Sequence, residues 1–395
     1  MRGVAQPQPG SNTRTIASQC SLVRVFSPLA RAFVDFSPPI AWSSRPQTVK
    51  GDERCSVKTL RFMRGLMNMQ MRGKARNKVS LLGKARRRFL GLSLTETSFD
   101  KRGFLTGEEK ARQRLEQIGI TFLSGYHAAL EETGFVPLAR RLASVDAESR
   151  GFAFEGAAMG LALLDCFTPW RKDRWRTFTE HLAQPHVYMM HVGLGWALAR
   201  LRRCVTPHLA RLDPLLGWLV IDGYGFHEGY FDWRRYVEAR AIPARLDGYA
   251  RRVFDQGLGR SIWFVKGADV AAVARAIDAF PPARRDDLWS GAGLACAYAG
   301  GCGRAALQSL RVSADGHLPA LAQGVAFAAK TRQRAANLNP YTDTVCRVMC
   351  GHSAEDAAAI TDAALKDLHG EDGLPAYEVW RRRIQNKLAV EVITT

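Results

Sequence analysis

The sequence predicts an all-α, multihelical protein. Three observations support this prediction: helix-capping signals recur along the chain, apolar residues follow them at helical spacing, and alternating strand patterns are scarce. The short strand candidates are 218–221 and 262–265, and each of them also fits a buried helix. Hydrophobic residues make up 47% of the chain and charged residues 24%, which are ordinary values for a folded globular protein.

Each expected helix of the body begins at a recognisable starting residue and then carries an apolar stripe. The starting residues are Thr106, Asp269, Ser353 and Pro375. Thr106–Glu109 and Ser353–Asp356 fit the capping box, in which a side-chain oxygen accepts a hydrogen bond from the third following backbone N–H. We expect Pro281 and Pro282 to end the second of these helices, and Gly370 to close the third.

Small-residue segments recur along the body at steps near the period of helix-pair repeats. Aligned on one glycine each, they lie 37, 36, 28, 34 and 33 residues apart. The aligned glycines are Gly156, Gly193, Gly229, Gly257, Gly291 and Gly324. The residue before the glycine is polar in five segments, at Glu155, Glu228, Gln256, Ser290 and Gln323. We therefore expect stacked helix-pair repeats with these side chains along one inner surface, although 35 glycines could also produce such steps by chance.

The strong positive charge belongs to the N-terminal part of the chain. The formal net charge of +19 divides into 18 basic and three acidic residues over 1–90, and 38 basic and 34 acidic residues over 91–395. Residues 1–70 are rich in Ser, Pro and Arg and show no helical period, so we expect a disordered basic extension before a single helical body at 71–395. A start assigned too early and an organelle transit peptide are the alternatives for this segment.

Several classes of function lack their signatures in this sequence. The basic run at 72–88 has no interleaved aromatic residues, so we do not expect nucleic-acid binding. Phosphate-loop and nucleophile-elbow motifs are absent, and Ile262 stands where a dinucleotide fingerprint needs its third glycine. Zinc ligands do not occur in two matching halves, so we predict no metal site and leave any cofactor unknown. Eight cysteines and the lack of a transmembrane span fit a cytoplasmic protein.

The segment 212–264 carries the densest mixture of glycine, aromatic and ionisable residues. We expect Glu155, His227 and Glu228 to handle protons, because apolar surroundings raise the pKa of a carboxyl group toward neutral pH. The residues expected to bind substrate are Asp222, Tyr224, Asp255, Gln256, Arg260 and Gln323. Among them, Arg260 would anchor an acidic group. The alternative is a structural region in which glycines allow close packing and the charges pair with one another.

Several long strings in the body resemble one known family. They include 154–159, 213–218, 222–231, 254–260 and 287–291. Together they look like the uncharacterised family encoded beside enediyne polyketide synthases, and the resemblance covers about residues 86–388. It implies a place beside an iterative polyketide synthase, a membrane protein and other cluster proteins, in the conversion of a linear polyene to the enediyne core. It implies no particular reaction and no catalytic residues.

Two hypotheses for the function follow. In the first, the protein binds a polyene-derived or carrier-tethered intermediate in an apolar groove and assists its conversion to the enediyne core. In the second, it is a non-catalytic helical scaffold that brings together the synthase, its acyl-carrier domain and the membrane partner. The block 169–176 mixes Trp with cations and could serve as a docking face, although an amphipathic helix with core Trp residues is the favoured interpretation. Either function places the protein in the cytoplasm, with membrane association through a partner.

Overall fold

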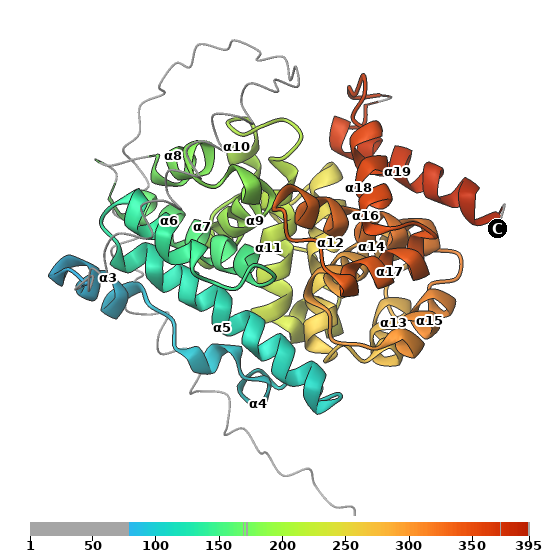
Figure 1. Cartoon of the computed structure of the whole chain (residues 1–395), viewed down its shortest axis with the longest axis horizontal. Helices are drawn as coiled ribbons and strands as arrows, with labels where there is room; N and C mark the ends of the chain where they lie inside the picture. The colour runs from blue at the N-terminus through green and yellow to red at the C-terminus, as the bar shows by residue number, and fades with distance from the viewer. Residues whose placement is uncertain (1–78, 169, 171–172, 372, 394–395) are drawn as a thin grey trace, which may run out of the picture. The chain divides into compact units, whose positions relative to one another are not determined.

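The computed structural model describes residues 79–168, 170, 173–371 and 373–393, and in this part of the chain the regular structure is helical. Extended pairing there is limited to one isolated bridge between Glu371 and Leu374. The all-α prediction is therefore confirmed, and both strand candidates lie in helices (Figure 1). The described residues belong to one compact unit, Lys74–Thr395. The expected basic extension at 1–70 lies outside the described residues.

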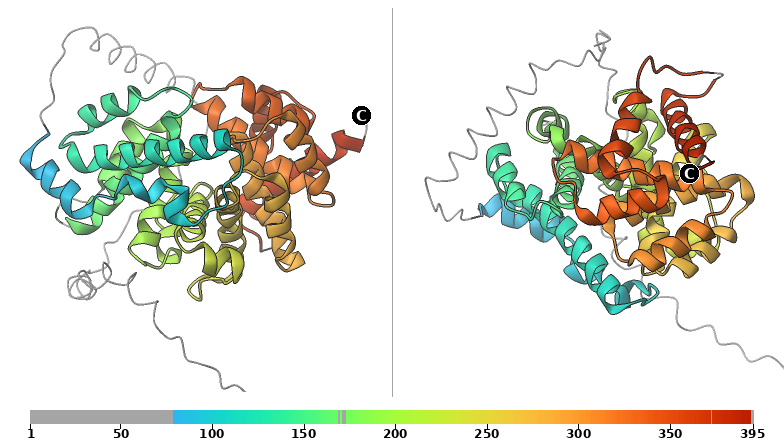
Figure 2. Two further views of the ribbon diagram at one scale, coloured as in Figure 1. Left: turned by 90° about the horizontal axis from the view of Figure 1, so that it is seen from below. Right: turned by 45° about the vertical axis from the view of Figure 1, so that its right-hand side comes forward.

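Long helices form the centre of the fold, and each packs against the next in chain order. They are α5 (Glu109–Glu131), α7 (Arg150–Phe167), α9 (Val187–Arg200), α11 (Trp218–Phe231), α12 (Gly248–Val265), α14 (Pro282–Ala299) and α16 (Leu318–Arg334). The helix α19 (Ala376–Ile393) packs on α16 at the C-terminal end. The views of Figure 2 keep the N-terminal helices on one side of this unit and the C-terminal helices on the other.

Shorter helices lie before the central ones and connect them. They are α3 (Leu81–Leu90), η1 (Leu94–Thr97), α4 (Phe99–Arg102), α6 (Phe135–Ala143), α8 (Arg174–His181), η2 (Gln184–His186), α10 (Thr206–Leu209), the π-helix η3 (Arg234–Glu238), α13 (Val270–Asp278), α15 (Arg304–Ser313), α17 (Pro340–Cys350) and α18 (Ala354–Ala363). Most central helices are thus followed by a short outer one, as in a stack of helix pairs.

Glycines bring the central helices into backbone contact. A Cβ at any of these glycines would lie only 1.9 to 2.1 Å from a carbonyl oxygen of the preceding central helix. The glycines are Gly156, Gly193, Gly223, Gly257, Gly291 and Gly324. Because no side chain fits at such a distance, these positions admit only glycine without moving the helices apart. From Gly193 onward, each glycine of the series meets the carbonyl oxygen of the residue that stands just before the previous glycine. For example, Gly193 meets the carbonyl oxygen of Glu155, which stands just before Gly156.

The prediction that Gly229 belongs to this series is wrong, because Gly223 takes the place. A Cβ at Gly223 would meet the carbonyl oxygen of Val192 at 2.0 Å, whereas one at Gly229 would meet side-chain atoms of Ser261 and Leu258. Helix α11 contains several glycines, so spacing alone did not single out the one that touches backbone. The polar residue of this repeat is consequently Asp222 rather than Glu228.

The sequence predicts a side-chain cap at three helix starts, and two of these caps are present. Asp269 accepts from the Ala272 N–H at 2.8 Å, and Ser353 from the Asp356 N–H at 3.1 Å. The Thr106 box is wrong, because α5 begins at Glu109 after Glu108, which makes no side-chain cap. The segment before α5 is held instead by the turn after α12, where the Leu105 N–H donates to the Val265 carbonyl at 2.9 Å.

The C-terminal prediction for α18 is also wrong. This helix ends at Ala363, well before Gly370. Its last carbonyls are met by backbone N–H groups of the following turns, in which the Leu365 N–H donates to the Asp362 carbonyl at 3.1 Å. Pro375 directly precedes α19, which begins at Ala376, so that start is one residue from its predicted place.

Candidate functional site

A line of buried polar side chains runs along the glycine contacts. Its members stand just before the glycines, at the same level on successive helices, and are at most 1% exposed. They are Glu155, Asp222, Gln256, Ser290 and Gln323. The predicted inner surface therefore exists, with Asp222 in place of Glu228. Buried polar groups of this kind are stable only when they pair or when something else satisfies them.

Asp222 is the centre of this line. It forms an ion pair with Arg260, and both side chains are almost fully buried. Gln256 donates a hydrogen bond to the Asp222 Oδ2 at 2.9 Å and a second to the Tyr377 hydroxyl at 3.0 Å. The Arg260 guanidinium also lies 4.6 Å from the centre of the Phe226 ring. The structure thus brings together three of the residues expected to bind substrate, and Arg260 already holds an acidic group, Asp222.

Glu155 and Gln323 are the members of this line with a side-chain atom left unpaired by the described residues, and in Glu155 that atom belongs to an ionisable group. The buried Oε1 of Glu155 makes no hydrogen bond of normal geometry with the described residues, although the indole N–H of Trp196 lies close enough to lower the pKa of the carboxyl group. Burial raises the pKa of Glu155 to about 7, although the positive charge of Arg260 acts in the opposite direction. This carboxyl group can therefore both accept and donate a proton near neutral pH.

A pocket of about 50 Å³ lies beside Glu155, between α5, α7, α9, α11, α12 and the segment 92–97. Most of its lining is aromatic or aliphatic. The lining residues are Leu92, Glu96, Thr97, Ile118, Gly119, Phe122, Leu123, Phe152, Glu155, Trp196, Phe226, Tyr230, Phe231 and Phe264. We call this space the aromatic pocket. Ligand sites typically combine such an apolar lining with a few polar groups, as Glu155 provides here.

A second cavity, of about 30 Å³, adjoins the Asp222–Arg260 pair. Its lining comes from both halves of the helix stack. The residues are Tyr188, Met189, Val192, Leu219, Asp222, Arg260, Leu294, Tyr298, Phe327, Lys330, Thr331 and Trp380. We call it the Arg260 cavity. Arg260 lines this cavity while its ring partner Phe226 lines the aromatic pocket, so the two spaces flank one polar cluster.

His227 and Glu228 form a pair of their own. The His227 Nδ1 lies 3.3 Å from the Glu228 Oε1, and the imidazole packs against Phe231 and Trp196. Burial lowers the pKa of His227, and Glu228 partly opposes that effect. Burial acts to raise the pKa of Glu228, but the combined effects of His227, Tyr236 and Arg202 outweigh burial and the pKa is lowered. Neither residue lines the aromatic pocket, and Trp196 lies between His227 and that space.

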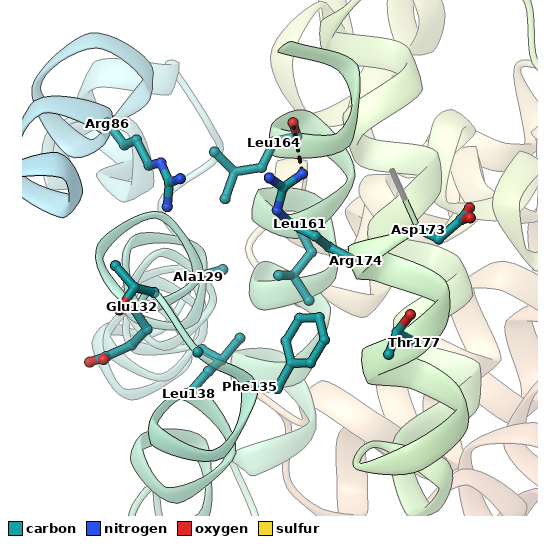
Figure 3. Close-up of a pocket in the computed structure, with 12 residues that line it drawn as sticks. Arg86, Ala129, Glu132, Phe135, Leu138, Leu161, Leu164, Asp173, Arg174 and Thr177 are labelled. Carbon is teal, nitrogen blue, oxygen red and sulfur yellow. Dashed lines mark hydrogen bonds between the residues drawn. The ribbon is translucent and has the colours of Figure 1, made fainter. Parts of the chain in front are cut away.

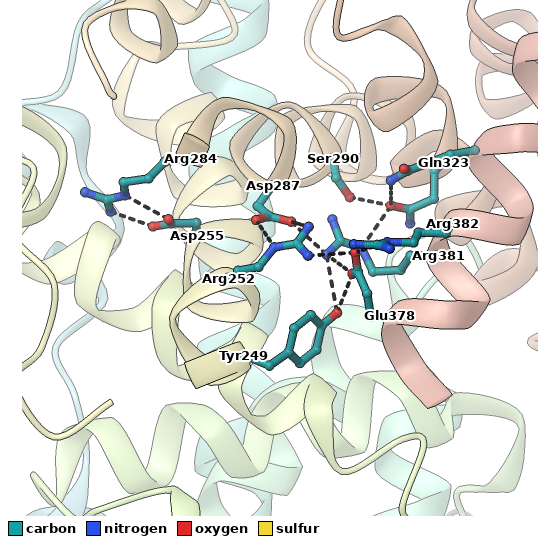
Figure 4. Close-up of polar contacts among 11 residues, drawn as sticks. Tyr249, Arg252, Asp255, Arg284, Asp287, Ser290, Gln323, Glu378, Arg381 and Arg382 are labelled. Atoms are coloured by element: carbon teal, nitrogen blue, oxygen red, sulfur yellow. Dashed lines mark hydrogen bonds and ion pairs between the residues drawn. The ribbon is translucent and has the colours of Figure 1, made fainter. Parts of the chain in front are cut away.

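The remaining predicted binding residues have partners other than Asp222 and Arg260. Asp255 is held by Arg284, whose Nε donates to its Oδ2 at 2.8 Å (Figure 4). Tyr224 is buried, and burial together with the charge of Glu228 raises its pKa to about 12. Gln323 accepts a hydrogen bond from the Ser290 hydroxyl at 2.9 Å on the far side of the stack.

Residues 81–388 match the family described as "Protein of unknown function (DUF1702)". The chain belongs to this family. No curated protein and no solved structure matches it. The matched region of this DUF1702 member runs from α3 into α19, so the glycine series and both cavities lie entirely within it.

The DUF1702 region also contains a buried charged cluster that the sequence analysis missed. Arg381 is completely buried and meets Asp287 at 2.8 Å and Glu378 at 3.2 Å. Arg252 pairs with the same two carboxylates, and Tyr249 donates to Glu378 at 2.8 Å (Figure 4). The sequence contains a signal for this cluster, because Arg381 falls one helical turn after Tyr377 in the apolar stripe of α19. A cation in such a stripe indicates a buried partner.

A third pocket, of about 290 Å³, lies between α5, α6, α7 and α8 (Figure 3). None of the predicted site residues lines it. Phe135, Leu138 and Leu161 form its apolar part, and Arg174 beside it donates to the Leu164 carbonyl at 3.4 Å. The block 169–176 lies nearby. The amphipathic interpretation predicts that both of its Trp residues belong to the core, and one of them does.

Within that block, residues 169, 171 and 172 lie outside the described residues. Trp175 is buried and donates to the Met190 carbonyl at 2.9 Å, as a core residue should. Trp170 is 78% exposed, so its assignment to the core is wrong.

In the part of the chain that the structure describes, no three His, Cys, Asp or Glu side chains are grouped so as to hold a metal ion. No helix there combines the length and apolarity needed to cross a membrane.

Proposed function

We propose that this protein binds an extended, polyketide-derived polyene in the aromatic pocket and that Glu155 transfers protons on the bound chain. One observation carries the proposal: a buried carboxyl group with an unpaired oxygen borders a pocket that is otherwise mainly aromatic and aliphatic. A conjugated chain is flat and apolar, so it can pack against aromatic rings without unpaired polar groups. The pKa of about 7 suits Glu155 to general acid–base work at neutral pH.

The resemblance to the enediyne-associated family supports this choice of ligand. On this proposal the protein works in the cytoplasm, receives its ligand from the synthase or its acyl-carrier domain, and acts with other cluster proteins, among them a membrane protein. The product is a step toward the enediyne core. His227 and Glu228 remain in the proposal as a second proton-handling pair behind Trp196, from which they can exchange protons with solvent because both are partly exposed.

Binding is tested with diphenylhexatriene, a hydrocarbon polyene whose fluorescence rises in apolar sites. We expect the full chain to bind it, and Leu92→Trp to reduce that binding because Leu92 lines the pocket. Leu94→Trp is the matched control, since Leu94 is exposed and does not line the pocket. Equal binding by the wild type and both variants would contradict the proposed site.

The chemical role is tested by coexpression with the synthase and its neighbouring genes. Glu155→Gln should abolish product formation while diphenylhexatriene still binds, because glutamine keeps the shape of the side chain but cannot transfer the proton. Glu180→Gln on α8 is the control, since Glu180 is exposed. Normal product from the Glu155 variant would refute the proton-transfer role.

A scaffold is the second candidate function, and helix α3 provides an observation in its favour. Gly83 faces the body, where a Cβ would lie 2.2 Å from the Glu131 carbonyl oxygen. Leu81, Leu82 and Phe89 remain 85%, 53% and 69% exposed. If this face docks on the synthase, replacing the three apolar residues with Ser should abolish copurification of the synthase without changing diphenylhexatriene binding. Unchanged copurification would remove this candidate.

A further inference from the structure

Tyr298 carries a second unpaired polar group close to Glu155. Its hydroxyl is buried and has no hydrogen-bond partner among the described residues. The hydroxyl oxygen lies against Gly151, where a Cβ would be only 2.0 Å away. Gly151 and Glu155 are one turn apart on the same face of α7. Tyr298 therefore presents its hydroxyl on the face of α7 that carries the Glu155 carboxyl group.

The surroundings of Tyr298 hold its ring in place. The Arg332 guanidinium lies 4.4 Å from the ring centre, and the Phe152 ring packs edge-on at 5.0 Å. Tyr298 lines the Arg260 cavity, and Phe152, which packs on its ring, lines the aromatic pocket. Burial raises the pKa of Tyr298 to about 12, which keeps its hydroxyl protonated and able to donate. An unmet donor in such a place calls for an acceptor.

The chemistry of proton transfer indicates which kind of acceptor the Tyr298 hydroxyl would meet. A carboxylate whose pKa is about 7 is far too weak a base to take a proton from a plain hydrocarbon chain. A carbonyl group conjugated with the chain changes this, because the electron pair of the broken C–H bond is then delocalised onto oxygen. A hydrogen-bond donor placed at that oxygen stabilises the developing negative charge.

We propose that the ligand is a conjugated polyenone whose chain lies in the aromatic pocket beside Glu155 and whose carbonyl end reaches toward the Arg260 cavity, where its oxygen accepts a hydrogen bond from Tyr298. The inference rests on the proposed function, because Glu155 remains the group that moves the proton. Glu155 takes a proton from the saturated carbon next to the conjugated double bonds, and the electron pair of that C–H bond shifts through the double bonds to the carbonyl oxygen. Glu155 then returns the proton to another chain carbon. The net change is a shift of double bonds, which consumes no oxidant or reductant. Arg260 lies in the same cavity as Tyr298, where its ion pair with Asp222 balances its charge.

The test uses two probes of equal length, a linear ethyl ketone with four conjugated C=C bonds and the corresponding tetraene hydrocarbon. A hydrogen bond to the carbonyl oxygen shifts the absorption of the tetraenone to longer wavelength. We expect the full-length wild type to produce this shift. Tyr298→Phe should abolish it and weaken tetraenone binding about five- to tenfold, as expected for one hydrogen bond. Binding of the hydrocarbon should not change.

Tyr188→Phe is the matched control, because Tyr188 lines the same cavity and its hydroxyl meets Arg334 instead. Tyr298→Phe removes a hydroxyl without a described partner, so the fold should persist, which circular dichroism and thermal unfolding check. A missing shift in the wild type, or a shift that survives Tyr298→Phe, overturns the polyenone assignment alone. Failure of the hydrocarbon to bind the wild type overturns the proposed function as well, so the two failures are distinguishable.

Discussion

Gly193 lies directly on the backbone carbonyl of Glu155, so that a Cβ at residue 193 would stand 2.1 Å from that oxygen. This contact holds α9 against α7 at the turn that carries the Glu155 carboxyl group. Gly193→Ala must push the two helices apart, and overpacking of this kind typically costs about 1–3 kcal/mol. We expect a loss of that size in the free energy of unfolding, measured with urea.

Gly303→Ala is the control for this experiment. A Cβ at Gly303 meets nothing within 4 Å, and the backbone there is extended with φ of −88°. Its stability should stay within about 0.5 kcal/mol of the wild type, as is usual for exposed sites. A similar loss in both variants would mean that glycine is needed for reasons other than close helix contact.

The recurring small-residue segments allowed the stacking of the central helices to be predicted from sequence. The choice between Gly223 and Gly229 could not be made, because both lie on α11 and only the three-dimensional contact distinguishes them. Similarly, the segment 105–107 contacts the turn after α12, and this distant contact delays the start of α5 past the expected cap. Local patterns identify such elements, whereas their ends depend on residues far along the chain.

Helix geometry explains which site residues the structure brings together. Gln256 and Arg260 are four residues apart on α12, so both can face Asp222 on α11. Asp255 precedes Gln256 by one residue and is therefore turned about 100° away, toward Arg284. His227 and Glu228 follow Asp222 by five and six residues on α11, so both are turned away from it by roughly 120–140°. The aromatic pocket was not predictable, because its lining is drawn from five helices and the segment 92–97.

The pH dependence of stability should report on Glu155. Its pKa is about 7 in the folded protein, above its ordinary value of 4.5, so the folded state binds the proton more tightly than the unfolded state. The resulting contribution is fully present below pH 4.5 and is lost as the pH rises to about 7. Glu155→Gln stays neutral at every pH, so we expect it to gain up to about 3 kcal/mol over the wild type between pH 4.5 and 8. Urea unfolding at several pH values measures this, and a constant difference would contradict the raised pKa.

The Asp222–Arg260 pair should show strong coupling. Both side chains are buried, so Arg260→Gln leaves the charge of Asp222 without its partner and should cost about 3–5 kcal/mol. Adding Asp222→Asn removes that charge, and the double variant should be less destabilised than the sum of the two single variants. Denaturant unfolding of all four proteins gives the coupling energy. Additive losses would show that the pair contributes little.

The charged cluster on α19 offers a comparison between neighbouring arginines that share one partner. Arg381 and Arg382 both meet Glu378, but Arg381 is fully buried and also pairs with Asp287, whereas Arg382 is 53% exposed. Arg381→Met leaves two buried carboxylates with only the partly exposed Arg252 and Arg382 to balance them, so we expect a loss of about 3–5 kcal/mol. Arg382→Met removes an exposed ion pair and should cost less than about 1 kcal/mol. Thermal or urea unfolding separates the two, and equal losses would mean that burial does not set the strength of these contacts.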